Sequence, residues 1–145
     1  MNLENCHLDH VAIAVTSIHE AQKIYEQIGF SFNSHIEEVP SQKVKVAFAK
    51  IDHHAQIELL ESTSEESSVA KFIAKNGPGL HHLCFQVESI EEKQKEMQAQ
   101  GIKFIYEKPF IGAHNCLVNF IHPKSTGGVL IELSQKVEND VSKTT

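Results

Sequence analysis

Residues 8–32 read LDHVAIAVTSIHEAQKIYEQIGFSF, and residues 80–104 read LHHLCFQVESIEEKQKEMQAQGIKF. The two segments align without a gap at a separation of 72 positions, and ten of their 25 positions are identical. The tripeptide IEL then recurs in both copies, at 57–59 and at 131–133. Internal repetition of this kind is typical of a duplicated structural unit. We therefore expect two similar modules within one chain.

Hydrophobic patterning predicts the same order of elements in each copy. In the first, a β-branched apolar strand over 10–15 precedes a helix over 17–28, which Ser17 caps and Gly29 ends. Further strands are predicted at 30–38, 43–51 and 55–60. The second copy has a strand at 80–87, a helix at 89–99, and strands at 102–107, 116–122 and 128–134. Each copy is thus predicted to be a βαβββ unit.

These two units define an α+β fold in which two small sheets, related by a pseudo-twofold axis, form a cup. We expect one domain made of module 8–61 and module 80–135. A short helix and a glycine-containing hinge over 65–79 would join them, and the polar tail 136–145 would fray.

The composition narrows the class of protein. The chain has 145 residues and a net charge of −6, whereas a nucleic-acid binder usually has a basic face. No apolar run approaches the roughly 18 residues that a membrane-spanning helix needs, and the N-terminus lacks the pattern of a secretory signal. Three widely spaced cysteines do not form a disulfide framework. We expect a cytoplasmic protein.

One imidazole and one carboxylate occupy matching places in each module. Alternation along a strand places His10 and His82 on the face opposite the packed apolar residues. Glu58 and Glu132, each flanked by apolar neighbours, also face away from the packed layer. A slip of the strand would turn Glu61 inward instead of Glu58.

Two imidazoles and two carboxylates on the concave side favour a metal site. A buried carboxylate is costly unless it is paired or bound to a cation, and nitrogen and oxygen donors suit a divalent transition metal. Of the neighbouring residues, His81 is expected on the opposite face from His82, in a structural role. Cys84 is expected to line the cavity and not to bind the metal.

With these features the chain resembles the vicinal oxygen chelate superfamily and, within it, the methylmalonyl-CoA epimerases. The resemblance extends from about residue 8 to residue 135. It rests on the segments LDHVAIAV (8–15), SVAKF (68–72), GLHHL (79–83), IGAH (111–114) and HPKSTGGVLIEL (122–133).

The resemblance implies one divalent cation per chain (Co²⁺, Zn²⁺ or Mn²⁺), held by His10, Glu58, His82 and Glu132. It also implies an acyl-CoA thioester substrate, methylmalonyl-CoA, and a homodimer. Some members carry a glutamate on the third strand as a second proton-transfer base, but the matching stretch 43–48 here has no carboxylate.

Epimerisation at C2 would proceed through a metal-stabilised enolate and needs a proton-transfer group on each face of the substrate. Glu132 is the leading candidate for the catalytic base. For the opposite face Glu58, Glu37, Glu38 and a bound water remain open. His114 is a weaker candidate for substrate binding, and so is Lys124. Further lysines that could contact the CoA phosphates are Lys71, Lys75 and Lys108.

Three other functions use a similar cup. A glyoxalase-I-type lactoylglutathione lyase would share the four ligands, but the loop motifs at 111–114 and 122–133 argue against it. A ring-cleaving dioxygenase would use two histidines and one carboxylate, and the Glu58 position makes it less favoured. A binding protein that sequesters a drug or toxin would bind tightly without turnover.

Overall fold

The computed structural model describes residues 5–137 and contains the predicted order of elements. The first module comprises β1 (His7–Ala14), α1 (Ile18–Ile28), β2 (Glu37–Val39), β3 (Val44–Lys50) and β4 (Gln56–Ser62). Helix α2 (Ser68–Asn76) links it to the second module, which comprises β5 (Gly79–Gln86), α3 (Ile90–Ala99), β6 (Phe110–Ile111), β7 (Leu117–Ile121) and β8 (Ile131–Gln135). Two 3₁₀ turns are η1 (Ala113–Asn115) and η2 (Pro123–Ser125). Residues 138–145 of the predicted frayed tail lie outside the described part.

All eight strands form one curled mixed sheet in the order β2-β3-β4-β1-β5-β8-β7-β6. The central strands β1 and β5 are antiparallel, and each pairs in parallel with the last strand of its own module, β4 or β8. The pairing of β1 with β5 is symmetric about Val11 and Leu83, which are partners. The pseudo-twofold axis therefore passes between the two central strands, and the α+β cup fold is confirmed. Two small sheets were expected, but the strands of both modules form one continuous sheet.

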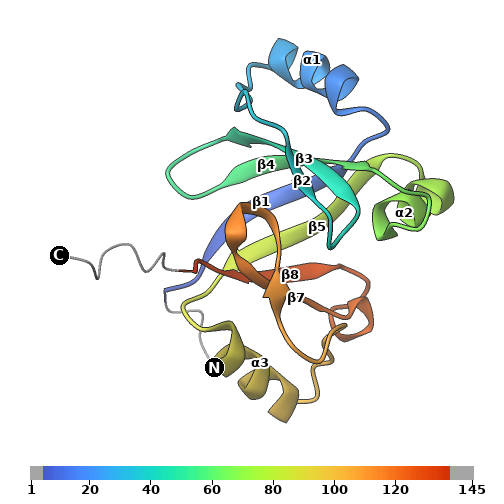
Figure 1. The fold of residues 1–145 in the computed structure, drawn as a ribbon. Coiled ribbons are helices and arrows are strands. Elements are labelled where there is room, and N and C mark those ends of the chain that lie inside the picture. The colour runs from blue at the N-terminus through green and yellow to red at the C-terminus, as the bar shows by residue number, and fades with distance from the viewer. Residues whose placement is uncertain (1–4, 138–145) are drawn as a thin grey trace.

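Helices α1 and α3 cover the convex face of the sheet, whereas α2 packs on the concave side. Figure 1 shows α1 and α3 at opposite ends of the molecule, with α2 beside the central strands. Helices α1 and α3 are capped alike, because Ser17 Oγ accepts from Glu20 N and Ser89 Oγ accepts from Glu92 N. Each module has its own core beneath its helix, and α2 packs Val69 into a third cluster on the concave side.

Two predicted strands are wrong over most of their length. Residues 30–36 make only an isolated bridge, from Phe32 to Ala49, before β2 begins at Glu37. Residues 102–107 likewise make one bridge, Phe104 to Ile121, and β6 forms later, at 110–111. Each segment precedes an edge strand, β2 or β6. The chain makes one bridge, leaves the sheet, and pairs with it again in the edge strand.

In the second module, buried side chains replace strand pairing. The amide of Asn119 donates to the backbone oxygen of Tyr106 at 2.9 Å and to Gln94 Oε1 at 2.9 Å. Gln94 Nε2 in turn donates to Glu107 O at 2.9 Å. These bonds satisfy the backbone oxygens that a strand would have paired, so the segment 105–107 is held without being a strand.

Other boundaries differ by a few residues. The linker helix begins at Ser68 and not at Glu65, because Ser67 Oγ accepts from Ala70 N and fixes the N-terminus there. Strand β8 begins at Ile131, after Gly127 and Gly128 take positive φ values of 71° and 108°. Among the described residues, no helix is long and apolar enough to cross a membrane.

Candidate metal centre and cavity

The four predicted ligands lie together on the concave side of the sheet. His10 on β1 and His82 on β5 are 5% and 7% exposed, and Glu58 on β4 and Glu132 on β8 are 4% and 8% exposed. The parallel pairing places Glu58 opposite Ala12, and Glu132 opposite Cys84. Each carboxylate therefore lies on the strand beside a histidine-bearing strand.

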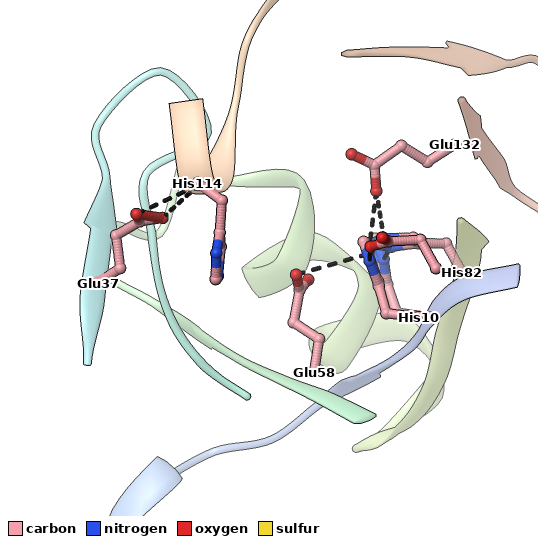
Figure 2. Close-up of polar contacts among 8 residues, drawn as sticks. His10, Glu37, Glu58, His82, His114 and Glu132 are labelled. Atoms are coloured by element: carbon pink, nitrogen blue, oxygen red, sulfur yellow. Dashed lines mark hydrogen bonds and ion pairs between the residues drawn. The ribbon is translucent and has the colours of Figure 1, made fainter. Parts of the chain in front are cut away.

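The polar atoms of these side chains converge on one point, as Figure 2 shows. His10 Nε2 lies 3.2 Å from His82 Nε2. Glu132 Oε2 lies 3.3 Å from His10 Nε2 and 2.8 Å from His82 Nε2. Glu58 Oε2 lies 3.5 Å from His10 Nε2. Of the two candidates on β4, Glu58 is thus the inward residue, whereas Glu61 Oε1 accepts from Ile18 N at the start of α1.

Two β-bulges adjoin the histidines. Between Leu8 and His10 strand β1 has one residue more than β5, and that residue is Asp9; in β5 the extra residue is His81. Asp9 Oδ2 lies 2.7 Å from His10 Nδ1, and His81 Nδ1 lies 2.9 Å from His82 Nδ1. The prediction that His81 points to the opposite face is wrong, because a bulge interrupts the alternation of side chains.

Burial and mutual contact determine the charges in the cluster. Burial opposes the charged form of His10, but the Glu58 carboxylate and the hydrogen bond to Asp9 raise its pKa well above the ordinary value. Burial raises the pKa of Glu58. Burial also opposes ionisation of Glu132, but hydrogen bonds from both histidines lower its pKa. For His81, burial and the neighbouring His82 lower the pKa to about 4.

These donors fit a single divalent cation. Ligand atoms about 2.1 Å from one ion lie about 3.0–3.4 Å apart in octahedral or tetrahedral geometry. Four distances within the cluster, 2.8–3.5 Å, are close to this range, and His10, Glu58 and His82 bring ligand atoms within 4.8 Å of one another. In their neutral forms both imidazoles can direct an Nε2 lone pair to a cation at this point, in place of the contacts with Glu132. Phe48 and Phe120 contact the His10 and His82 rings edge-on and shield the cluster.

Cys84 also lies close to His10. Asp9, His10 and Cys84 bring ligand atoms within 4.8 Å of one another. However, His10 Nδ1 is already hydrogen-bonded to Asp9, and burial raises the pKa of Cys84 to about 12. Cys84 is also absent from the residues that line the cavity, so the prediction that it lines the cavity is wrong; its side chain is fully buried beside His10.

A cavity of about 260 Å³ opens from the cluster. Its lining is mainly apolar and includes the four candidate ligands, Tyr106, His114 and Lys136. Of the weaker candidates for substrate binding, His114 therefore lines the cavity. Lys124 is exposed on η2 and is absent from the lining, as are Lys71, Lys75 and Lys108. Lys136 was missed, although the alternation that places Glu132 and Ser134 on the cavity side of β8 continues to it.

The edges of the curled sheet meet across the cavity. His114 N donates to the Glu37 carboxylate, at 3.0 Å to Oε2 and 3.2 Å to Oε1. Ser41 Oγ donates to Ile111 O at 3.3 Å. Figure 2 shows Glu37 and His114 across from the two histidines, with Glu58 between them. Asp9 and His81 thus contact the candidate ligands directly, whereas Glu37 is joined to His114 on the far side of the cavity.

With this geometry established, comparison with known proteins identifies the class. Residues 9–120 match the family described as the Glyoxalase/Bleomycin resistance protein/Dioxygenase superfamily. The chain belongs to this superfamily, and the predicted vicinal oxygen chelate fold is confirmed.

Within the superfamily the chain belongs to the methylmalonyl-CoA epimerases, which are isomerases. It is 36% identical to the human mitochondrial methylmalonyl-CoA epimerase over 129 residues, covering 88% of this chain and 73% of the human protein. An ethylmalonyl-CoA/methylmalonyl-CoA epimerase of Cereibacter sphaeroides is 37% identical, covering 88% of this chain and 96% of that protein. The structure of Streptomyces coelicolor methylmalonyl-CoA epimerase in complex with 2-nitronate-propionyl-CoA has a TM-score of 0.85 and 31% identity, covering 90% of this chain and 97% of that one.

Proposed function

We propose that the protein epimerises (R)- and (S)-methylmalonyl-CoA by removing and returning the C2 proton with the aid of one divalent cation. The observation that carries this proposal is the convergence of two buried imidazoles and two buried carboxylates at the base of the cavity. A cation held there, Co²⁺, Zn²⁺ or Mn²⁺, would polarise the thioester and carboxylate oxygens of the substrate. The S. coelicolor epimerase supports this substrate class, because a nitronate is planar and anionic like an enolate.

Glu132 supplies the base for one face of the substrate. Its Oε2 contacts both histidines, whereas Figure 2 shows the other carboxylate oxygen directed away from them. That second oxygen is available to accept a proton from carbon. The lowered pKa keeps the carboxylate ionised at neutral pH, so it is present in the form that accepts a proton.

Glu37 handles the proton on the opposite face. It projects from β2, across the cup from Glu132, and the His114 N–H fixes its carboxylate. Glu38, the next residue on the same strand, is exposed, and alternation along β2 directs it to the face opposite Glu37 and the cavity-lining Val39. Glu58 remains with the histidines, where its Oε2 is 3.5 Å from His10.

The test is exchange of the C2 hydrogen of each epimer with deuterated water, followed by mass spectrometry of the metal-loaded protein. Glu132→Gln should slow exchange of one epimer by about 10²–10⁴-fold, and Glu37→Gln should slow exchange of the other. Glu38→Gln is the matched control and should leave both rates unchanged. Metal content is measured for each variant, because Glu132 is also a candidate ligand.

The outcomes separate the parts of the proposal. Wild-type protein that binds a cation but exchanges neither epimer would refute the epimerase function. Normal exchange of both epimers by Glu37→Gln would remove Glu37 from the mechanism, and the same result for Glu132→Gln would remove Glu132. Turnover of the hemithioacetal of methylglyoxal and glutathione would favour the glyoxalase-type alternative.

The homodimer is also a proposal. Strands β2 and β6 end the sheet, and strand edges commonly pair between subunits. Light scattering that gives twice the mass of the 16.2 kDa chain would support it, and the single-chain mass would contradict it.

A further inference from the structure

We propose that Asp9 and His81, the extra residues of the two bulges, are positioning residues that orient the imidazoles of His10 and His82 toward the cation. This inference rests on the proposed metal dependence. The proposed metal site then includes, besides the four candidate ligands, the two residues that fix the tautomers of His10 and His82.

The bulges explain why a strand can hold both residues of each pair on the concave side. In a regular strand, neighbours point to opposite faces, so Asp9 and His10 would be separated by the sheet. The symmetric register of β1 and β5 inserts one unpaired residue before each histidine. The extra residue then reaches the Nδ1 atom of its neighbour, at 2.7 Å in one module and 2.9 Å in the other.

The hydrogen bonds fix which nitrogen faces the cation. When Nδ1 donates its hydrogen to a neighbour, the lone pair of the neutral imidazole is left on Nε2. In both modules Nε2 is the atom that points to the convergence point. His81 must accept through Nδ1, so its own hydrogen is on Nε2. The His81 ring also contacts the Phe72 ring edge-on, and this contact helps to hold His81 in that orientation.

The two pairs differ in strength although their geometry matches. Asp9 offers a carboxylate, and a charge-assisted hydrogen bond is about twice as strong as a neutral one. His81 offers a neutral imidazole nitrogen. A carboxylate partner also makes the imidazole a more basic metal ligand. We therefore expect His10 to depend more on Asp9 than His82 depends on His81.

The test measures Co²⁺ affinity by competition with a chelating dye, together with the visible absorption spectrum of the bound Co²⁺. Loss of such a partner costs about 10–100-fold in metal affinity. Asp9→Ala should reach the upper end of that range and Asp9→Asn should fall between it and the wild type. His81→Phe, which keeps a ring against Phe72 but has no acceptor, should lower affinity less than Asp9→Ala. His81→Gln, which keeps an acceptor oxygen, should recover most of the loss.

Glu26→Gln on the exposed face of α1 is the charge-matched control for Asp9→Asn. Its affinity and spectrum should equal those of the wild type. Urea unfolding of the metal-free variants checks that each is folded. The isosteric Asp9→Asn and the polar His81→Gln keep the test informative if Asp9→Ala or His81→Phe unfolds the protein.

The results distinguish this inference from the function on which it rests. If wild-type protein binds no Co²⁺, the proposed metal dependence fails. If wild-type protein binds Co²⁺ but folded Asp9→Asn and His81→Phe bind with the same affinity and spectrum, only the positioning role is overturned. Reduced affinity in the graded order, with altered spectra, supports it.

Discussion

Replacing Asn119 by Ala should destabilise the protein and loosen the wall of the cavity. Asn119 is fully buried, and its side chain donates to Gln94 Oε1 and Tyr106 O and accepts from Phe120 N at 2.8 Å. The substitution leaves the buried Gln94 Oε1, the part-buried Tyr106 O and the Phe120 N–H without this partner. At about 1 kcal/mol for each hydrogen bond lost, the free energy of unfolding should fall by about 3 kcal/mol.

Urea denaturation measures this change. With a slope of about 2 kcal/mol per molar urea, the midpoint should move down by about 1.5 M. Asn76→Ala is the control, because Asn76 is exposed and makes a single 3.2 Å side-chain bond, to Phe72 O. That variant should stay within about 0.5 kcal/mol of the wild type.

The same variant has a functional consequence. Ile105 and Tyr106 line the cavity, and the Asn119 side chain joins the backbone oxygen of Tyr106 to Gln94 on α3. In the metal-loaded enzyme the KM for the acyl-CoA should rise more than kcat falls, because the candidate ligands lie on other strands. A loss of stability below about 1 kcal/mol would refute the reasoning, since it would mean that the buried amide is not what holds the 105–107 segment.

Three further predictions concern the cluster, a thiol and a glycine. The pKa of His10 is raised in the folded protein, so a cation that binds there must displace its proton. Calorimetry should therefore show that protons are released on metal binding. The metal affinity should fall as the pH is lowered through that pKa. Constant affinity from pH 6 to 8 would contradict this. Cys84 is buried with a pKa of about 12, so a thiol reagent should leave it unmodified in the native protein and label it in urea. A Cβ at Gly112 would lie 3.0 Å from Val118 Cγ2, so Gly112→Ala should lower the unfolding free energy by about 1 kcal/mol. Val118→Ala removes part of a buried side chain and is itself destabilising, but Gly112→Ala should cost less in that background than in the wild type; an equal cost in both would count against the steric cause.

The sequence predicted the central strands and the placement of the four candidate ligands well, for a simple physical reason. Alternation holds along β4 and β8, so the carboxylate of each IEL tripeptide must face opposite to its apolar neighbours. Because the segment is duplicated, His10 and His82 occur at equivalent positions of the two modules. These inferences need only local geometry and the repeat.

What the sequence could not predict depends on how strands pair. The bulges at Asp9 and His81 exist only in the register between β1 and β5, so the side on which His81 lies could not be read from β5 alone. Lys136 depends on where β8 ends. The predicted strand stopped at residue 134, but β8 continues to Gln135, so the alternation of Glu132 and Ser134 extends to Lys136 and brings it to the cavity.

The edge strands show why symmetry in the ligands does not extend to the groups around them. Glu37 pairs with Val46, and Phe110 pairs with Val118, the residue 72 positions later. Glu37 and Phe110 therefore occupy equivalent places, and only the first module offers a carboxylate there. Glu132, on the other side of the cup, belongs to the second module. A reaction that needs one proton-transfer group on each face of a planar intermediate would thus draw one from each module. In this proposal the duplication provides the symmetric cradle for the cation, and the later divergence of the edge strands provides the second base.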